Sequence, residues 1–204
     1  MIIGSPLSSS DQVTVMRSEE PVTDARLRIV EAAIRCIAHE GVHGASMALI
    51  AADTGVSKAL LHYHFTDRAQ LLSEVVRTLS TRLATRERGA IEHAQAARTV
   101  DALWAWLENE LRQGELRALL ELQLVRDASL REVLYRAATI RRNSATATVE
   151  RLFAQLELTP RVPVDLIGDA ALAFVDGLVL NDEMSQRARV SFDVFWLAIL
   201  SLGD

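Results

Sequence analysis

The chain contains little cysteine, proline or lysine, and it has no long apolar run. Its one cysteine, Cys36, has no second cysteine to pair with, so a disulfide framework within the chain is excluded. Four prolines in 204 residues leave long stretches free of helix-breaking residues. No apolar run is long enough to cross a bilayer, and no secretory signal is recognisable. Together these absences predict a soluble, cytoplasmic protein.

The residues that are present favour helices. Hydrophobic residues make up 50% of the chain, enough for a sizeable core, and Ala and Leu are frequent. Apolar residues recur at helical spacing along most of the sequence, which predicts an all-α protein of about nine helices. Residues 1–22 lack this periodicity and are rich in serine, so we expect a disordered tail there.

The stretch from Ser46 to Phe65 predicts two short helices joined by a tight turn. Ser46 and Ser57 are good N-caps, because a serine hydroxyl accepts a hydrogen bond from an otherwise unpaired backbone N–H. Gly55 favours the left-handed backbone that ends a helix. Leu61 and Phe65 are four residues apart and share one buried side, which leaves the second helix free to project outward. This is the pattern of a helix-turn-helix and predicts DNA binding; an ordinary helical hairpin is the alternative.

Residues 27–76 resemble the N-terminal domain of TetR-type transcriptional regulators. The resemblance implies a three-helix DNA-binding domain at residues 23–72 and a larger helical domain for ligand binding and dimerisation at residues 73–204. Repression is the default function in this family. An enzyme is not expected, because the sole cysteine lies in the first predicted helix, no GxSxG motif or phosphate-binding loop appears, and the histidines cluster around the helix pair. The matching positions are Glu40-Gly41, Ser46, Ile50-Ala51, Gly55-Val56-Ser57, Leu61 through Phe65, and Thr66 onward.

Candidate DNA contacts lie on and beside the second helix of this pair. Lys58 is the only lysine of the chain and can donate to guanine or to phosphate. Arg68 stands where members of the family often have a basic residue that contacts a DNA phosphate, which implies the same contact for Arg68. The serine caps suit phosphate, and the other side chains suit base edges or close approach. The full set is Ser46, Ser57, Lys58, Ala59, Leu60, His62, Tyr63, His64 and Arg68.

The net charge of −5 is unusual for a DNA-binding protein, but it is unevenly distributed. Residues 1–88 contain 10 Lys or Arg and 10 Asp or Glu, whereas residues 89–204 contain 12 and 17. The acidity therefore belongs to the C-terminal part. The neutral N-terminal part predicts few phosphate contacts and a shallow salt dependence of DNA binding.

The C-terminal part predicts a ligand pocket among several helices. A long helix that starts after Thr66 and runs to about residue 87 connects it to the DNA-binding part, with Gly89 at its weak end. Polar residues that interrupt apolar helix faces between residues 100 and 156 can orient a ligand, with aromatic residues as walls. A filled core is the alternative for each of them. The candidates are Trp104, Leu107, Leu120, Gln123, Leu124, Tyr135, Arg141 and Thr148.

The last two helices are apolar on more than one face. A helix of this kind must be buried on both sides, and at the end of a small chain the second side is most simply another subunit. The family also dimerises through its last two helices, so both arguments predict a homodimer. The predicted interface residues are Ala171, Phe174, Val175, Leu178, Phe192, Phe195, Trp196 and Ile199.

The sequence thus predicts a ligand-responsive regulator, in the form of a homodimer on a palindromic DNA operator, with an unidentified small-molecule effector. No cofactor, metal or membrane contact is expected. The alternative is a helical ligand-binding or adaptor protein with a weakened DNA-binding domain (residues 23–72), which we call the reader. It rests on Ala48, Leu49, Leu60 and His62, which stand where the family often has hydrogen-bonding residues.

Overall fold

The computed structural model describes residues 22–95, 98–125, 127–181 and 186–204. The predicted disordered tail lies outside these residues, except for Val22, where the first helix begins. In the described ranges the secondary-structure elements are all helices, which confirms the all-α prediction. Near the C-terminus the backbone of Thr159 and Asp204 is paired by two hydrogen bonds, beside an isolated bridge between Pro160 and Gly203.

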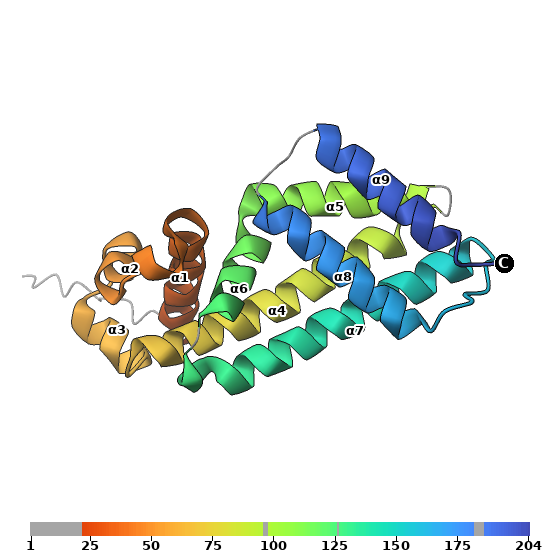
Figure 1. Cartoon of the computed structure of the whole chain (residues 1–204). Helices are drawn as coiled ribbons and strands as arrows, with labels where there is room; N and C mark the ends of the chain where they lie inside the picture. Colours follow the sequence, from red (N-terminus) through yellow and green to blue (C-terminus); the bar gives the residue numbers. More distant parts are fainter. Residues whose placement is uncertain (1–21, 96–97, 126, 182–185) are drawn as a thin grey trace, which may run out of the picture.

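The first three helices form a compact unit at one end of the molecule (Figure 1). They are α1 (Val22–Gly44), α2 (Met47–Thr54) and α3 (Lys58–His64). Gly41 has a φ of 71° and a ψ of 170° and interrupts α1 near its end. Leu61 and Phe65 are buried, as their spacing predicted.

Helix α4 (Arg68–Glu92) runs from this unit into the rest of the molecule (Figure 1). The sequence predicted an end near residue 87 with Gly89 as a weak point, and this was wrong. The helix continues to Glu92 because Ile91, in its last turn, is buried in the core and holds the turn in place. The predicted domain boundary between residues 72 and 73 falls inside this continuous helix, and the two-domain division stays a prediction.

The remaining helices pack around the distal part of α4. In Figure 1, α7 lies alongside α4 and α9 lies beside α5, and the C-terminus is far from α1–α3. Their bounds are α5 (Thr99–Gln113), α6 (Glu115–Leu124), a 3-10 turn (Ala128–Leu130), α7 (Arg131–Gln155), α8 (Val164–Leu180) and α9 (Gln186–Leu200).

Two arginines of α4 connect four helices. Arg82 forms ion pairs with Glu31 of α1 and, at 2.7 Å, with Glu115 of α6. Arg86 forms ion pairs of 2.6 Å with both Glu115 and Glu110, the latter on α5. We call Glu31, Arg82, Arg86, Glu110 and Glu115 the arginine junction. It fixes α1, and with it the first three helices, to the rest of the fold.

The crossing of α7 and α8 gives a test of the packing. A Cβ added at Gly168 of α8 would lie 2.9 Å from Oγ1 and 3.0 Å from Cα of Thr146 on α7, so the two helices would have to separate. Gly168→Ala should therefore lower the free energy of unfolding by about 1–3 kcal/mol. Urea denaturation measures this change.

The matched control is Gly89→Ala in α4. A Cβ at Gly89 meets nothing within 4 Å, and alanine favours the helix. This variant should raise the free energy of unfolding by about 0.5–1 kcal/mol. A Gly168→Ala protein as stable as the Gly89→Ala protein would contradict the close crossing.

Candidate nucleic-acid interface and internal pocket

The α2–α3 unit has the local geometry of a helix-turn-helix. The Ser46 and Ser57 hydroxyls accept hydrogen bonds from the backbone N–H of Leu49 (3.2 Å) and Leu60 (3.1 Å), as the sequence predicted. Gly55 ends α2 with a φ of 67°, the left-handed conformation that glycine adopts without strain. Because these caps fix both helix starts, α3 projects one defined face to solvent.

Most of the predicted DNA contacts lie on an exposed surface. Tyr63 has an exposed fraction of 73%, and Leu60 keeps 37% of its surface in solvent. An exposed lysine, histidine and tyrosine among small and apolar residues offer donors for phosphates and base edges. The exposed members of the predicted set are Ser46, Ser57, Lys58, Ala59, Leu60, His62 and Tyr63.

His64 and Arg68 face the protein more than solvent. The His64 ring lies edge-on to Tyr63, with 5.3 Å between ring centroids, and its Nε2 is buried without a hydrogen-bond partner. The Arg68 guanidinium donates to the backbone carbonyls of Ala45 (3.2 Å) and Val42. These bonds tie the start of α4 to the segment before α2, so Arg68 holds the reader together here. Its contact with phosphate stays a prediction.

An internal pocket lies between α4, α5, α6, α7, α8 and α9. Its volume is about 40 Å³, so in this conformation it has room for no more than a few water molecules. The walls are largely apolar, with aromatic rings and a few polar groups. They comprise Leu83, Ala84, Glu87, Leu103, Trp106, Leu116, Arg141, Ser144, Ala145, Thr148, Ala171, Leu172, Val175, Phe192 and Trp196.

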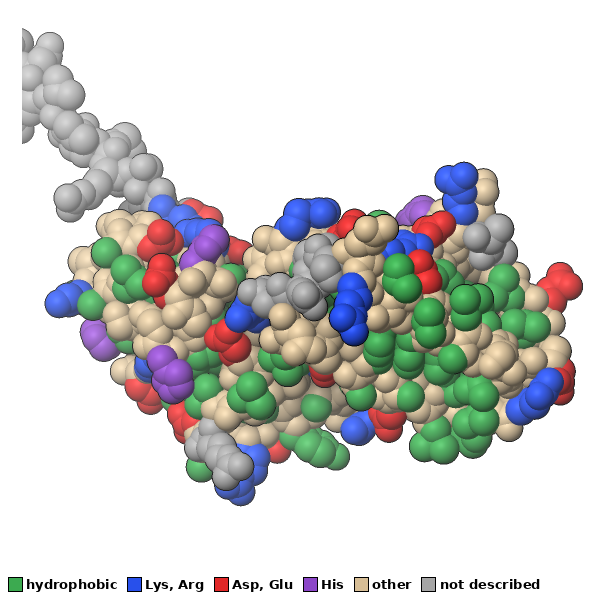
Figure 2. Space-filling view, turned by 45° about the horizontal axis from the view of Figure 1, so that its top comes forward, with side chains coloured by type: hydrophobic (Ala, Val, Ile, Leu, Met, Phe, Trp, Pro, Cys, Tyr) green, Lys and Arg blue, Asp and Glu red, His purple; other side chains and the backbone are tan. Residues whose placement is uncertain are grey.

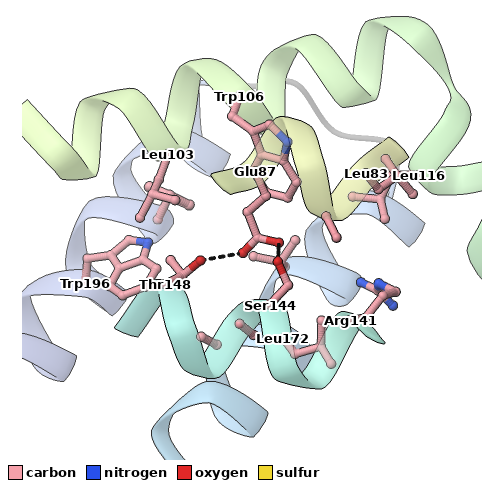
Figure 3. A pocket seen from close by; sticks show the side chains of 15 residues that line it. Leu83, Glu87, Leu103, Trp106, Leu116, Arg141, Ser144, Thr148, Leu172 and Trp196 are labelled. Carbon is pink, nitrogen blue, oxygen red and sulfur yellow. Dashed lines mark hydrogen bonds between the residues drawn. The ribbon is translucent and has the colours of Figure 1, made fainter. Parts of the chain in front are cut away.

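A carboxylate from α4 occupies the centre of this pocket. Figure 3 shows Glu87 beside Thr148 and Ser144, with Trp196 and Arg141 on opposite sides. The hydroxyls of Ser144 and Thr148 donate to Glu87 at 2.7 and 2.8 Å. Burial raises the pKa of Glu87 above its ordinary value, and the two hydroxyls and Arg141 only partly offset this effect. The carboxyl is therefore held in its neutral form to a higher pH than in water.

Two indole N–H groups in the same pocket have no partner. Trp106 Nε1 and Trp196 Nε1 are buried and without a hydrogen bond. An unpaired buried donor carries a desolvation cost of about 1–3 kcal/mol. Both tryptophans also line the pocket.

The pocket includes only part of the predicted ligand set. Arg141 and Thr148 line it. Leu107 and Leu120 are buried in the core, and Trp104 packs edge-on against Phe192, with 5.2 Å between ring centroids. Leu124 and Tyr135 have exposed fractions of 68% and 71%. Six predicted ligand-binding residues do not line the pocket: Trp104, Leu107, Leu120, Gln123, Leu124 and Tyr135. Their role in ligand binding stays a prediction.

Sequence reasoning missed Glu87, Trp106 and Ser144. The signal for Glu87 was present, because it follows Leu79 and Leu83 at four-residue spacing and so continues the apolar stripe of α4 with an acid. A charged residue on a buried stripe is unusual and points to a special environment. Trp106 and Ser144 carry no comparable pattern.

Four predicted interface residues lie inside the subunit: Ala171, Phe192, Trp196 and Ile199 are buried. Phe174, Val175, Leu178 and Phe195 are partly buried, and Phe174 and Phe195 stack with a ring separation of 4.2 Å. The large exposed apolar residues of α8 and α9 are a different set. They are Leu166, Leu180, Val190, Val194 and Leu197, which we call the α8–α9 stripe.

The described residues contain neither a metal-binding cluster nor a membrane-spanning helix. In these ranges no group of three or more His, Cys, Asp or Glu side chains is placed to hold a metal ion. The helices in the same ranges include none with the length and hydropathy needed to cross a membrane.

Comparison with known proteins identifies the first three helices and the start of α4. Residues 29–75 match the model of the bacterial regulatory proteins of the tetR family. A transcriptional regulator BetI from Agrobacterium fabrum is 44% identical over 54 residues, a match that covers 26% of this chain and 26% of that protein. A BetI protein from Rhizobium meliloti is 28% identical over 193 residues, which cover 85% of this chain and 84% of that protein.

Solved structures also share the overall fold of the chain. A transcriptional regulator from Saccharomonospora viridis, solved in complex with choline, aligns with a TM-score of 0.66 at 22% identity. The alignment covers 85% of this chain and 95% of that one. The first three helices match the family model, and the chain shares its overall fold with this solved structure. Both findings agree with the resemblance seen in the sequence. Members of this family are regulators and not enzymes. Over residues 29–75 the chain thus matches the tetR family of bacterial regulatory proteins, and along most of its length it is similar to a BetI transcriptional regulator.

Proposed function

We propose that the chain is a ligand-responsive repressor that binds a palindromic DNA operator as a homodimer and is released by a small-molecule effector. One observation carries the proposal. A capped helix-turn-helix with an exposed second helix is joined by one continuous helix, α4, to a body with an internal pocket. Because its target is chromosomal DNA, the proposal places the protein in the cytoplasm.

The reader surface supports selective rather than non-specific binding to DNA. Lys58 and Tyr63 are exposed on α3 and offer donors to bases and phosphates. Nearby arginines are already occupied, because Arg26 pairs with Glu74 at 3.2 Å and Arg35 pairs with Asp53 at 2.6 Å. With few free cations, binding should depend on α3 entering the major groove and only weakly on salt.

The α8–α9 stripe supports a homodimer. Val190, Val194 and Leu197 are spaced four and three residues apart, so they form one row along α9. Figure 2 shows hydrophobic side chains gathered on the half of the molecule away from α1–α3. A two-fold pairing of this surface would bury the row and leave both readers free. Two readers give a palindromic site, with half-sites about 34 Å or a multiple of it apart.

The pocket supports control by an effector. Because its volume is about 40 Å³, a small organic molecule can enter only if the lining moves. Glu87 belongs to α4, so a movement there is transmitted along the helix that begins at the reader. A coupling free energy of about 1–3 kcal/mol would change operator affinity by roughly 5- to 150-fold. The choline complex of a protein with the same fold also supports a small-molecule effector.

Fluorescence anisotropy with the intergenic DNA beside the gene tests this function. The expected result is saturable binding of the purified protein that prefers the native duplex to a scrambled duplex and persists at near-physiological salt. Equal binding to both duplexes, or none, would contradict a sequence-reading regulator and favour the adaptor alternative.

Tyr63→Ala tests the reader surface. The side chain is exposed on α3 and contributes little to the core, so the variant should fold normally. Loss of its hydroxyl and ring should weaken operator affinity by about 1–3 kcal/mol, or roughly 5- to 150-fold. The matched control is Tyr135→Ala, because Tyr135 is about equally exposed (71% against 73%) but lies on α7. Equal operator affinity in the two variants would remove Tyr63 from the interface.

Leu197→Asp tests the homodimer. A carboxylate within the α8–α9 stripe would be buried without a partner on association, so the variant should be monomeric by sedimentation equilibrium and should lose operator affinity. The matched control is Leu124→Asp, because Leu124 has the same exposed fraction of 68% but lies on α6. A Leu197→Asp protein that remains dimeric would show that subunits meet elsewhere.

A further inference from the structure

The side of α3 that points away from the core presents a leucine. Leu61 and Phe65 are buried, so the opposite side of the helix is the exposed one. This side carries Leu60, with an exposed fraction of 37%, and Tyr63, which follows three residues later and is its neighbour on the helix surface. Ala59 is exposed beside them, and its short side chain leaves room for close approach of a partner.

The N-cap of α3 places this leucine in the first turn of the helix. The Ser57 hydroxyl accepts a hydrogen bond from the backbone N–H of Leu60, which is the third residue of α3. In a helix-turn-helix the N-terminal residues of the second helix contact base edges in the major groove, whereas the first helix crosses the DNA backbone. Leu60 is therefore expected at a base edge. Leu49, the third residue of α2, is not.

The two helices lack the side chains that read bases through paired hydrogen bonds. Arginine makes such pairs with guanine, and asparagine or glutamine makes them with adenine. None of these three residue types occurs between Ser46 and Phe65. Lys58, His62 and Tyr63 can donate hydrogen bonds, so apolar contact is the form of base recognition that remains for Leu60.

A leucine at a base edge favours one base over the other three. In the major groove the C5-methyl group of thymine is the apolar group that a base offers. The edges of guanine, adenine and cytosine carry ring nitrogens, carbonyl oxygens or amino groups. A leucine that covers these groups displaces their water and gives no hydrogen bond in return. Contact with Leu60 is therefore favourable at thymine and unfavourable at the other bases.

We propose that Leu60 reads the C5-methyl group of a thymine in each half-site of the operator. Leu60 is then a specificity-determining residue of the reader, and each half-site contains a T·A pair opposite the first turn of α3. Ala59 lets the helix approach closely enough for this contact. The inference rests on the proposed function, because it names a base that the proposed operator contains.

The test is fluorescence anisotropy of the full chain with modified forms of one duplex. The probes are the intergenic DNA beside the gene and a series in which deoxyuridine replaces one thymine at a time, which removes only the methyl group. At one thymine in each half-site the replacement should weaken binding by roughly fourfold, the value of one methyl group removed from water. Replacement of both of these thymines should weaken binding by roughly 15-fold.

Leu60→Ala shows whether this preference comes from the leucine. The side chain is partly exposed and alanine favours a helix, so the variant should fold. It should bind the thymine and deoxyuridine forms equally, whereas a merely structural role would weaken both alike and leave their ratio unchanged. The matched control is Leu49→Ala, because Leu49 has a similar exposed fraction (41%) and the same position in α2. This control should retain the fourfold ratio.

Three results would overturn the inference: no single replacement weakens binding, Leu60→Ala keeps the preference for thymine, or Leu49→Ala abolishes that preference while Leu60→Ala does not. Each differs from a failure of the proposed function. A protein that prefers the native duplex to a scrambled one, but binds all the deoxyuridine forms equally well, is a regulator in which Leu60 does not read thymine. Equal binding to the native and scrambled duplexes would overturn both proposals.

Discussion

The position of the DNA reader depends on the arginine junction. Arg82 and Arg86 stand one turn apart on α4 and reach acids on α1, α5 and α6. Glu110 is fully buried and Glu115 has an exposed side-chain fraction of 13%, so these pairs are shielded from water. A shielded bidentate pair fixes direction as well as distance, because the guanidinium fork matches a carboxylate in one plane. Close backbone packing adds to the junction: Gly114, between α5 and α6, lets Ala38 of α1 approach, since a Cβ there would lie 3.2 Å from that of Ala38.

This arrangement gives α4 two roles. Arg68, in its first turn, bonds to the carbonyls that precede α2, and Glu87, in its distal half, stands in the pocket. The arginine junction lies between these two points. A change in the pocket that shifts or rotates α4 must therefore either strain the junction or move α1 and the reader with it. In a two-fold dimer such a movement would change the separation of the two readers. Binding to an operator whose half-sites are a fixed distance apart would then weaken.

Local chemistry explains what the sequence predicted well. Serine caps, Gly55 and the Leu61–Phe65 spacing act within one or two turns, so the reader could be predicted from neighbouring residues. The pocket depends on residues far apart in the chain, such as Glu87 and Thr148, and no local pattern indicates that they meet. The same limit explains the last two helices. Periodicity showed apolar faces on α8 and α9, but it could not tell which face covers the subunit's own core and which remains exposed, as Trp196 and Leu197 illustrate.

The operator affinity of the Arg82→Met variant tests most directly whether the arginine junction fixes the position of the reader. Arg82 is suited to this test because its loss leaves Glu115 paired with Arg86 and Glu31 partly in solvent, so the fold should persist. The expected result is an affinity loss of about 0.5–2 kcal/mol, roughly 2- to 30-fold, with dimerisation unchanged. Arg151→Met, which removes an exposed pair of 3.8 Å with Glu92, is the control and should have no effect. Equal operator affinity in the two variants would contradict the account and show that the reader is positioned without the junction.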